Sequence, residues 1–217
     1  AEDGIRYAQE SRGRGDVYKR QTPHLGASTV EAQKNVSISI AKQCLEVLSG
    51  RDAKYVVNAP IIPSEQHETI EPYAILGERM GRLMIQIIEG RVQKLEMIYG
   101  GDLAALGQSA KLITHMAIKG LLDPILRFPV NMVNAAYIAK DRGITVSETT
   151  TGESAGYRNL LTMKITTDSS ELVISGSVLY KGGARIVSIA GYTMDMVPEG
   201  AVIISRHLDR PGVIGRA

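Results

Sequence analysis

The chain has 217 residues, enough for one large domain or two small ones. Hydrophobic residues make up 44% of it and charged residues 22%, the proportions of an ordinary globular protein. Because 25 basic residues face 23 acidic ones, the formal charge is only +2, and this balance argues against a nucleic-acid or membrane partner.

Side chains suited to redox or metal chemistry are few. The single cysteine, Cys44, has no second cysteine to pair with and falls at an apolar position of a helical pattern. We therefore expect it in a core, and the chain in the reducing cytoplasm. The four histidines have no companions at metal-ligand spacing, so we expect no metal site. The sequence also lacks the Gly-x-Gly-x-x-Gly of dinucleotide-binding folds.

Residues 1–21 are rich in charged residues and glycine and show no apolar periodicity. We expect them to be a non-native or disordered leader that takes no part in the fold.

The next segment, Thr-Pro-His-Leu-Gly-Ala-Ser-Thr at residues 22–29, fixes a histidine between a proline and a glycine. A helical pattern follows at once, over residues 28–50. A histidine so placed is typical of a catalytic acid or base, since an unperturbed imidazole has a pKa of about 6.5 and exchanges protons near neutral pH. The alternative is a capped helix start with an incidental surface histidine.

Helices dominate the middle of the chain. Apolar spacing predicts a helix over residues 71–89, in which Gly77-x-x-x-Gly81 permits close helix packing. A strand is expected over residues 92–99, a helical region over 105–122, and a further helix over 131–140.

Strands dominate the remainder. Leu161, Met163 and Ile165 alternate with polar residues, and a turn at 168–170 leads to a second alternating run at 172–180. Residues 185–190 and 201–206 are expected to form further strands. Helices on one face of a mostly antiparallel sheet predict an α+β fold.

Residues 22–29, together with Glu31-Ala32-Gln33, resemble the catalytic-histidine segment of the D-2-hydroxyacid dehydrogenases, and more narrowly of the phosphoglycerate dehydrogenases of serine biosynthesis. The resemblance implies that His24 removes the hydroxyl proton of 3-phosphoglycerate while a hydride passes to NAD. By the same match the cofactor-binding residues would be His24, Leu25, Gly26 and Ala27.

Two further stretches, residues 133–144 and 175–180, resemble the intervening, or allosteric-substrate-binding, domain of the long members of that family. In the family this domain has been proposed to bind an anionic phosphate ligand. Arg158, in a polar loop, and Lys181, beside two glycines, are the basic residues best placed in the sequence to contact such an anion. Alternatively, both are simply solvated.

Residues 207–215 resemble the opening strand and helix start of an ACT domain, a small amino-acid-binding regulatory fold. The resemblance implies that His207, Asp209 and Gly212 bind an effector, with L-serine as the candidate. A capped helix start without a ligand is the alternative.

Taken together, the resemblance implies four parts. They are a leader (1–21), the end of a nucleotide-binding domain with its crossover helix (22–60), the intervening domain (61–196) and a truncated ACT start (197–217). The segments that hold NAD and substrate would lie upstream, so we expect these residues alone to be inactive, and the parent enzyme to be a homodimer or homotetramer. The alternatives are a stand-alone module that binds serine or a phosphate metabolite, and a dehydrogenase of another 2-hydroxy acid.

Overall fold

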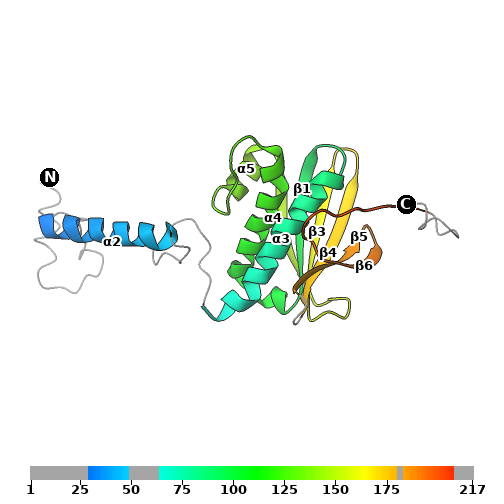
Figure 1. Ribbon diagram of the computed structural model, residues 1–217, viewed down its shortest axis with the longest axis horizontal. Helices are drawn as coiled ribbons and strands as arrows, with labels where there is room; N and C mark the ends of the chain where they lie inside the picture. Colours follow the sequence, from blue (N-terminus) through cyan, green and yellow to red (C-terminus); the bar gives the residue numbers. More distant parts are fainter. Residues whose placement is uncertain (1–28, 49–63, 180–182, 208–217) are drawn as a thin grey trace, which may run out of the picture. The chain divides into compact units, whose positions relative to one another are not determined.

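The computed structural model describes residues 29–48, 64–179 and 183–207 (Figure 1). The chain divides into two compact units, Ala1–Val57 and Asn58–Ala217, and each is described by itself. None of the helices in the described ranges combines the length and apolar character needed to cross a membrane.

In the first unit, the described residues form one helix, α2 (Val30–Leu48), which confirms the helix expected there. The Thr29 side chain caps it, because Thr29 Oγ1 accepts a hydrogen bond of 3.1 Å from the Ala32 amide. The apolar stripe is exposed, with Val30 84% accessible. Cys44 is exposed as well, so the prediction of a core cysteine is wrong. Its apolar position on the helix gives no burial because no second element packs on α2 among the described residues of this unit.

The second unit is an α+β domain, as predicted. Its described elements, in chain order, are η2 (Ser64–Gln66), α3 (His67–Ile87), β1 (Val92–Gly101), η3 (Asp102–Ala105), η4 (Gly107–Ala110), α4 (Lys111–Leu122), η5 (Asp123–Ile125), α5 (Ala135–Asp141), β2 (Thr145–Thr151), β3 (Asn159–Thr167), β4 (Glu171–Leu179), β5 (Gly183–Ile189) and β6 (Tyr192–Met196).

The six strands form one sheet in the order β2-β1-β3-β4-β5-β6. The β1–β2 pair is parallel and every other pair is antiparallel. A parallel pair needs a long crossover connection, and here the chain between β1 and β2 forms α4 and α5. The two edge strands, β2 and β6, were not predicted from the sequence.

Two of the expected helices are shorter than the sequence suggested. The region 105–122 contains the last residue of η3, then η4 and α4, and Gly107, the first residue of η4, has a φ of 54°. The helix expected over 131–140 begins only at Ala135, because Asn131 Oδ1 accepts hydrogen bonds from the Val133 and Asn134 amides and holds a turn there.

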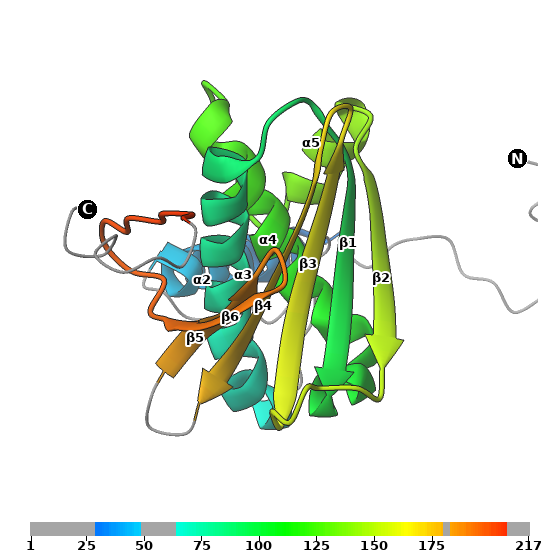
Figure 2. The same ribbon diagram turned by 90° about the vertical axis from the view of Figure 1, so that its right-hand side faces the viewer.

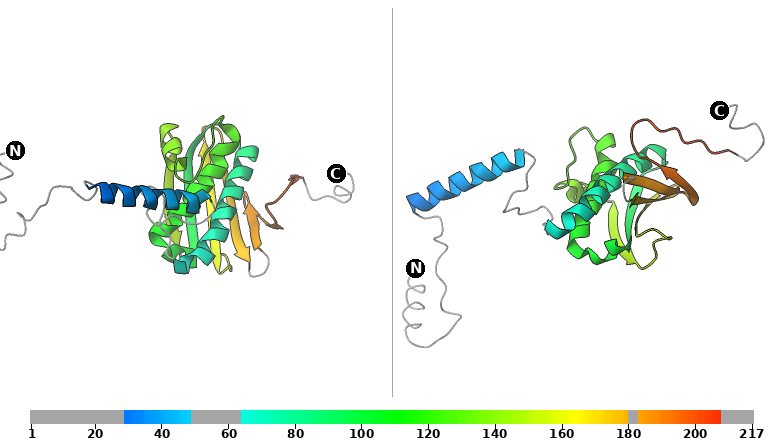
Figure 3. Two further views of the ribbon diagram at one scale, coloured as in Figure 1. Left: turned by 60° about the vertical axis from the view of Figure 1, so that its left-hand side comes forward. Right: turned by 60° about the horizontal axis from the view of Figure 1, so that its bottom comes forward.

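Helices α3, α4 and α5 of this unit lie side by side against one face of the sheet (Figures 2 and 3). In β3 every second residue is buried, so that Leu161, Met163 and Ile165 point into the core. The buried face of α3, which includes Leu76 and Met80, packs against them. The opposite face of the sheet is polar, as in the Thr162–Ser175 hydroxyl pair at 2.8 Å.

Glycines set the distance between α3 and α4. A Cβ placed on Gly81 would lie 2.3 Å from the Ala117 carbonyl oxygen, and one on Gly120 would lie 1.9 Å from the Glu78 carbonyl oxygen. The two backbones therefore touch, which confirms the close packing predicted from Gly77-x-x-x-Gly81.

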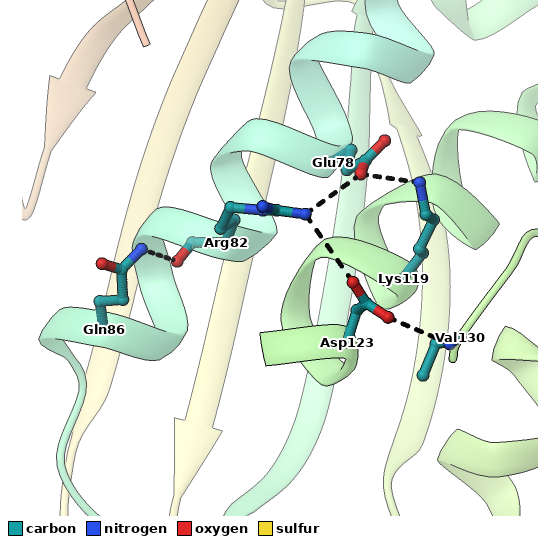
Figure 4. Close-up of polar contacts among 6 residues, drawn as sticks. All are labelled: Glu78, Arg82, Gln86, Lys119, Asp123 and Val130. Atoms are coloured by element: carbon teal, nitrogen blue, oxygen red, sulfur yellow. Dashed lines mark hydrogen bonds and ion pairs between the residues drawn. The ribbon is translucent and has the colours of Figure 1, made fainter. Parts of the chain in front are cut away.

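Ion pairs lie at the rim of this helix pair (Figure 4). Lys119 Nζ donates to Glu78 Oε1 at 2.8 Å, and Arg82 lies between Glu78 at 3.5 Å and Asp123 at 3.9 Å. Asp123 also accepts a hydrogen bond of 3.1 Å from the Val130 amide, which ties the middle of the loop toward α5 to the end of α4.

The strand expected over residues 201–206 is absent from the described residues. A strand needs a partner for its backbone groups, and no neighbouring strand reaches this segment within the described ranges. Ile203 is consequently 96% exposed. An ion pair between Arg79 and Glu199, 2.8 Å apart, connects the residues just before this segment to α3.

Candidate functional site

Most residues singled out from the sequence lie outside the described residues. These are His24, Leu25, Gly26, Ala27, Lys181, Asp209 and Gly212. Their predicted roles therefore stay predictions, and only Arg158 and His207 can be placed.

Arg158 lies in the loop between β2 and β3. Its Nε donates to Asp102 Oδ2 at 2.8 Å, and its side chain is 88% exposed. The loop itself is held close to the end of β1, since the Asp102 amide donates to Asn159 Oδ1 at 2.7 Å. An anion at Arg158 would compete with Asp102 for the guanidinium in this arrangement. The role of Arg158 in anion binding stays a prediction.

His207 is the last residue of the final described range and is exposed. The other two residues of the predicted effector site lie beyond it, so the structure does not bring the three together within the described ranges.

The structure adds a pocket that sequence reasoning missed. It has a volume of about 600 Å³ and lies between α4, α5 and the edge strand β2. The lining residues are Lys111, Thr114, His115, Ile118, Ala136, Lys140, Gly143, Ile144, Thr145, Val146 and Glu148. The pocket depends on the parallel β1–β2 pair, and because β2 was not predicted, nothing in the sequence indicated that these residues would meet.

A chain of hydroxyl groups runs beneath one wall of the pocket. The Tyr99 hydroxyl lies 2.6 Å from Thr114 Oγ1 and donates to the Ala110 carbonyl oxygen at 3.2 Å. The Thr114 hydroxyl in turn donates to Glu148 Oε1. Burial raises the pKa of the Tyr99 phenol well above its ordinary value of 10, so this hydroxyl remains protonated and available as a donor.

The pocket also holds an unsatisfied ring nitrogen. His115 Nδ1 is buried, and it has no hydrogen-bond partner among the described residues. A buried polar atom without a partner costs about 1–3 kcal/mol. This nitrogen is therefore left unsatisfied within the described residues.

Two lysines at the pocket differ from the other described lysines of this domain in their ion pairing. Lys94, Lys119 and Lys164 each lie 2.8 or 2.9 Å from a carboxylate oxygen. By contrast, Lys111 and Lys140 form no ion pair within the ranges that the structure describes. With one carboxylate, Glu148, against two ammonium groups, the pocket carries a net positive charge.

No group of three side chains suited to a metal ion occurs in the described part of the chain.

Comparison with known proteins identifies the domain that forms this pocket. Residues 69–190 match the family model of the D-3-phosphoglycerate dehydrogenase intervening domain. The chain belongs to this family. All the residues that line the pocket fall within the matched range, so the pocket is a feature of the intervening domain.

Curated relatives extend the similarity beyond the intervening domain. The chain is 41% identical over 195 residues to the D-3-phosphoglycerate dehydrogenase of Methanocaldococcus jannaschii, 40% to that of Synechocystis sp. and 36% to that of Bacillus subtilis. Each alignment covers 90% of this chain but only 35–37% of the relative. The chain thus spans about a third of the length of the relatives it matches.

Proposed function

We propose that this chain is the C-terminal part of a D-3-phosphoglycerate dehydrogenase, which oxidises 3-phosphoglycerate to 3-phosphohydroxypyruvate with NAD in L-serine biosynthesis. One observation carries the proposal: nine-tenths of the chain aligns, at 41% identity, with a relative of that name. The α+β intervening domain fits the same assignment.

In the proposed enzyme, His24 takes the proton from the substrate hydroxyl, a role that suits an imidazole held between Pro23 and Gly26. NAD accepts the hydride when bound, and Leu25, Gly26 and Ala27 would lie beside it. The chain contains no Gly-x-Gly-x-x-Gly, so the segment that holds the dinucleotide belongs elsewhere in such an enzyme. The 217 residues alone would then not turn over substrate.

The proposal assigns a regulatory role to the rest of the chain. L-Serine would act at His207, Asp209 and Gly212, and an anion at Arg158 and Lys181. The enzyme would be a cytoplasmic homodimer or homotetramer. These assignments rest on the resemblance and on the family membership of residues 69–190.

The test starts from the gene. Long-read sequencing of genomic DNA upstream of Thr22 would supply the missing coding sequence, and the restored protein would be assayed for NADH formation from 3-phosphoglycerate. We expect His24→Ala to lower kcat by roughly 10²–10⁴-fold, the usual effect of losing a general base. His67→Gln, at the start of α3, is the matched control and should keep its activity. Full activity in His24→Ala would refute the assignment.

A second candidate function is a stand-alone regulatory module that binds serine or a phosphate metabolite. It is favoured by one observation, that the buried core from Ile70 to Ile189 is formed by the second unit itself. An upstream stop codon in the genomic sequence, together with saturable serine binding by the 217-residue chain, would favour this function over the first.

A further inference from the structure

We propose that residues 202–206 close onto the free edge of β6 as a further strand of the sheet. The structure shows the strap, which we define as residues 197–207, in an open form without backbone hydrogen bonds to β6 among the described residues. The closed form is a hairpin of β6 and residues 202–206. The inference concerns the second unit alone, so it stands whether or not the complete protein is a dehydrogenase.

The outer edge of β6 is open to another strand. This strand lies at one end of the strand order and pairs only with β5 among the described strands. Its outward backbone N–H and C=O groups therefore form a template for a further strand. Residues 202–206 follow β6 after a loop of five residues, a length common in hairpins. The nearest segment able to cover this edge is thus in the same chain.

Side-chain contacts hold the strap at both ends. At its start, Arg79 of α3 lies 2.8 Å from Glu199, in the loop after β6. At its far end, the Arg206 guanidinium lies 6.0 Å from the centre of the Tyr192 ring, a cation–π contact with the first residue of β6. The strap therefore doubles back along β6, as Figure 2 shows, and only its middle has to move for the hairpin to close.

The contact between Arg206 and Tyr192 also defines the register of the closed hairpin. If these two residues face each other, residues 197–201 form the connecting loop, in which Gly200 has a φ of 66° and eases the reversal of the chain. Each step along β6 then matches a step back along the strap. The facing pairs are Tyr192 with Arg206, Met194 with Ile204, and Met196 with Val202.

The exposure of the strap residues already follows this register. Val202 is 41% exposed and Ile204 44%, whereas Ile203 between them is 96% exposed. Met194 and Met196, the residues that Ile204 and Val202 would face, pack partly buried against the core. Closure would thus extend the apolar face of the sheet, and the β-branched run Val-Ile-Ile has the composition of a strand.

The closed strap would act on the molecule in two ways. It would occupy an edge at which a strand from a second copy could add, and so it would guard the sheet against edge-to-edge association. It would also fix the position of the residues after 207 relative to β6, because an antiparallel partner has a single register once its inward face is apolar.

The test uses the 217-residue chain with Cys44→Ser, so that no native thiol takes part. Met194→Cys/Ile204→Cys puts a thiol on each strand at facing positions, and Met194→Cys/Ile203→Cys is the matched control, one residue out of register. Oxidised glutathione supplies the oxidant, and mass spectrometry after alkylation counts the intramolecular disulfide. Since a disulfide needs Cβ atoms about 3.5–4.5 Å apart, we expect the facing pair to close about tenfold faster or more.

The anchor on α3 is tested in the same assay. We expect Arg79→Ala to slow disulfide formation in the facing pair by roughly two- to fivefold, the effect of losing an exposed ion pair that holds the loop. Arg82→Ala is the matched control. Arg82 lies in the same helix but pairs with Glu78 and Asp123, so its loss should leave the rate unchanged.

Three results would overturn the inference. They are equal rates for the two cysteine pairs, equal rates in Arg79→Ala and Arg82→Ala, or the absence of a nuclear Overhauser effect between the Hα atoms of Met194 and Ile204 in the unsubstituted chain. The last measurement needs no substitution, so it decides the matter even if a cysteine variant fails to fold. None of these results bears on the dehydrogenase proposal, which is decided by the upstream gene and by His24→Ala.

Discussion

Tyr99 is the buried residue on which the wall of the pocket depends. Its side chain is 1% exposed and its hydroxyl contacts Thr114 and the Ala110 carbonyl. We expect Tyr99→Phe to lower the free energy of unfolding at neutral pH by about 1–2 kcal/mol, because a buried carbonyl and a buried hydroxyl lose a partner. Urea unfolding followed by circular dichroism measures this difference.

The effect of Tyr99→Phe on the free energy of unfolding should become smaller at high pH. Burial raises the pKa of Tyr99, so above pH 10 the unfolded chain releases the phenol proton while the folded chain keeps it. The stability of the unsubstituted protein is therefore complete below pH 10 and falls above it. The Tyr99→Phe variant has no phenol at this position and does not lose stability in this way. The difference in free energy of unfolding between the two proteins should therefore narrow as the pH rises above 10.

If the difference in free energy of unfolding stayed constant above pH 10, the conclusion that the Tyr99 phenol is buried and neutral would be wrong. Lys164 does not disturb the comparison. Its pKa is raised by its hydrogen bond to Glu171, and this pair is present in both proteins.

Among the elements, the α3–α4 pair gives the sharpest prediction. A Cβ on Gly120 would meet the Glu78 backbone, which cannot move without moving α3. Alanine would favour the helix by about 1 kcal/mol over glycine, yet we expect Gly120→Ala to destabilise the domain by about 1–3 kcal/mol, since overpacking outweighs the gain.

The matched control is Gly152→Ala, at a glycine with open space around it and no positive φ. It should change stability by less than about 0.5 kcal/mol in the same unfolding measurement. Equal effects of the two substitutions would show that the helices can separate at little cost.

The elements also show which structure a sequence pattern can predict. Strand β3 was predicted because one of its faces is buried, so Leu161, Met163 and Ile165 alternate with polar residues. Strand β2, Thr-Val-Ser-Glu-Thr-Thr-Thr, lies at the sheet edge and is largely exposed, so it has no apolar alternation to detect. At residues 201–206 the error was the reverse, because a strand was predicted and none is formed. This apolar run has no neighbouring strand in the described part of the chain with which its backbone forms hydrogen bonds.

The pocket was missed for the same reason. His115 and Lys140 lie in segments that were correctly predicted as helical, but only the pairing of β1 with β2 brings α4, α5 and Glu148 together. Such a site depends on tertiary contacts, which neither spacing nor composition contains. The motif at His24 could be found without the fold because its residues are contiguous.

For the whole molecule, we expect residues 64–217 to fold without the first 63. Among the described residues, every member of the buried core lies between Ile70 and Ile189. The shortened chain should therefore unfold cooperatively, with a Tm within about 2 °C of the complete chain, as measured by circular dichroism at 222 nm. A broad transition, or a large fall in Tm, would show that the first 63 residues support the core.

The position of β1 in the sheet has a consequence for synthesis on the ribosome. This strand pairs with β2 and β3, both of which come later in the chain, after α4 and α5. When β1 leaves the exit tunnel its backbone groups have no strand to bond with, and its buried side chains Leu95 and Met97 have no sheet to complete. Translation must reach Thr167 before both neighbours are available. A pause in translation before that point would prolong the exposure of an apolar strand with two open edges, which is the state in which a nascent chain is most prone to aggregate.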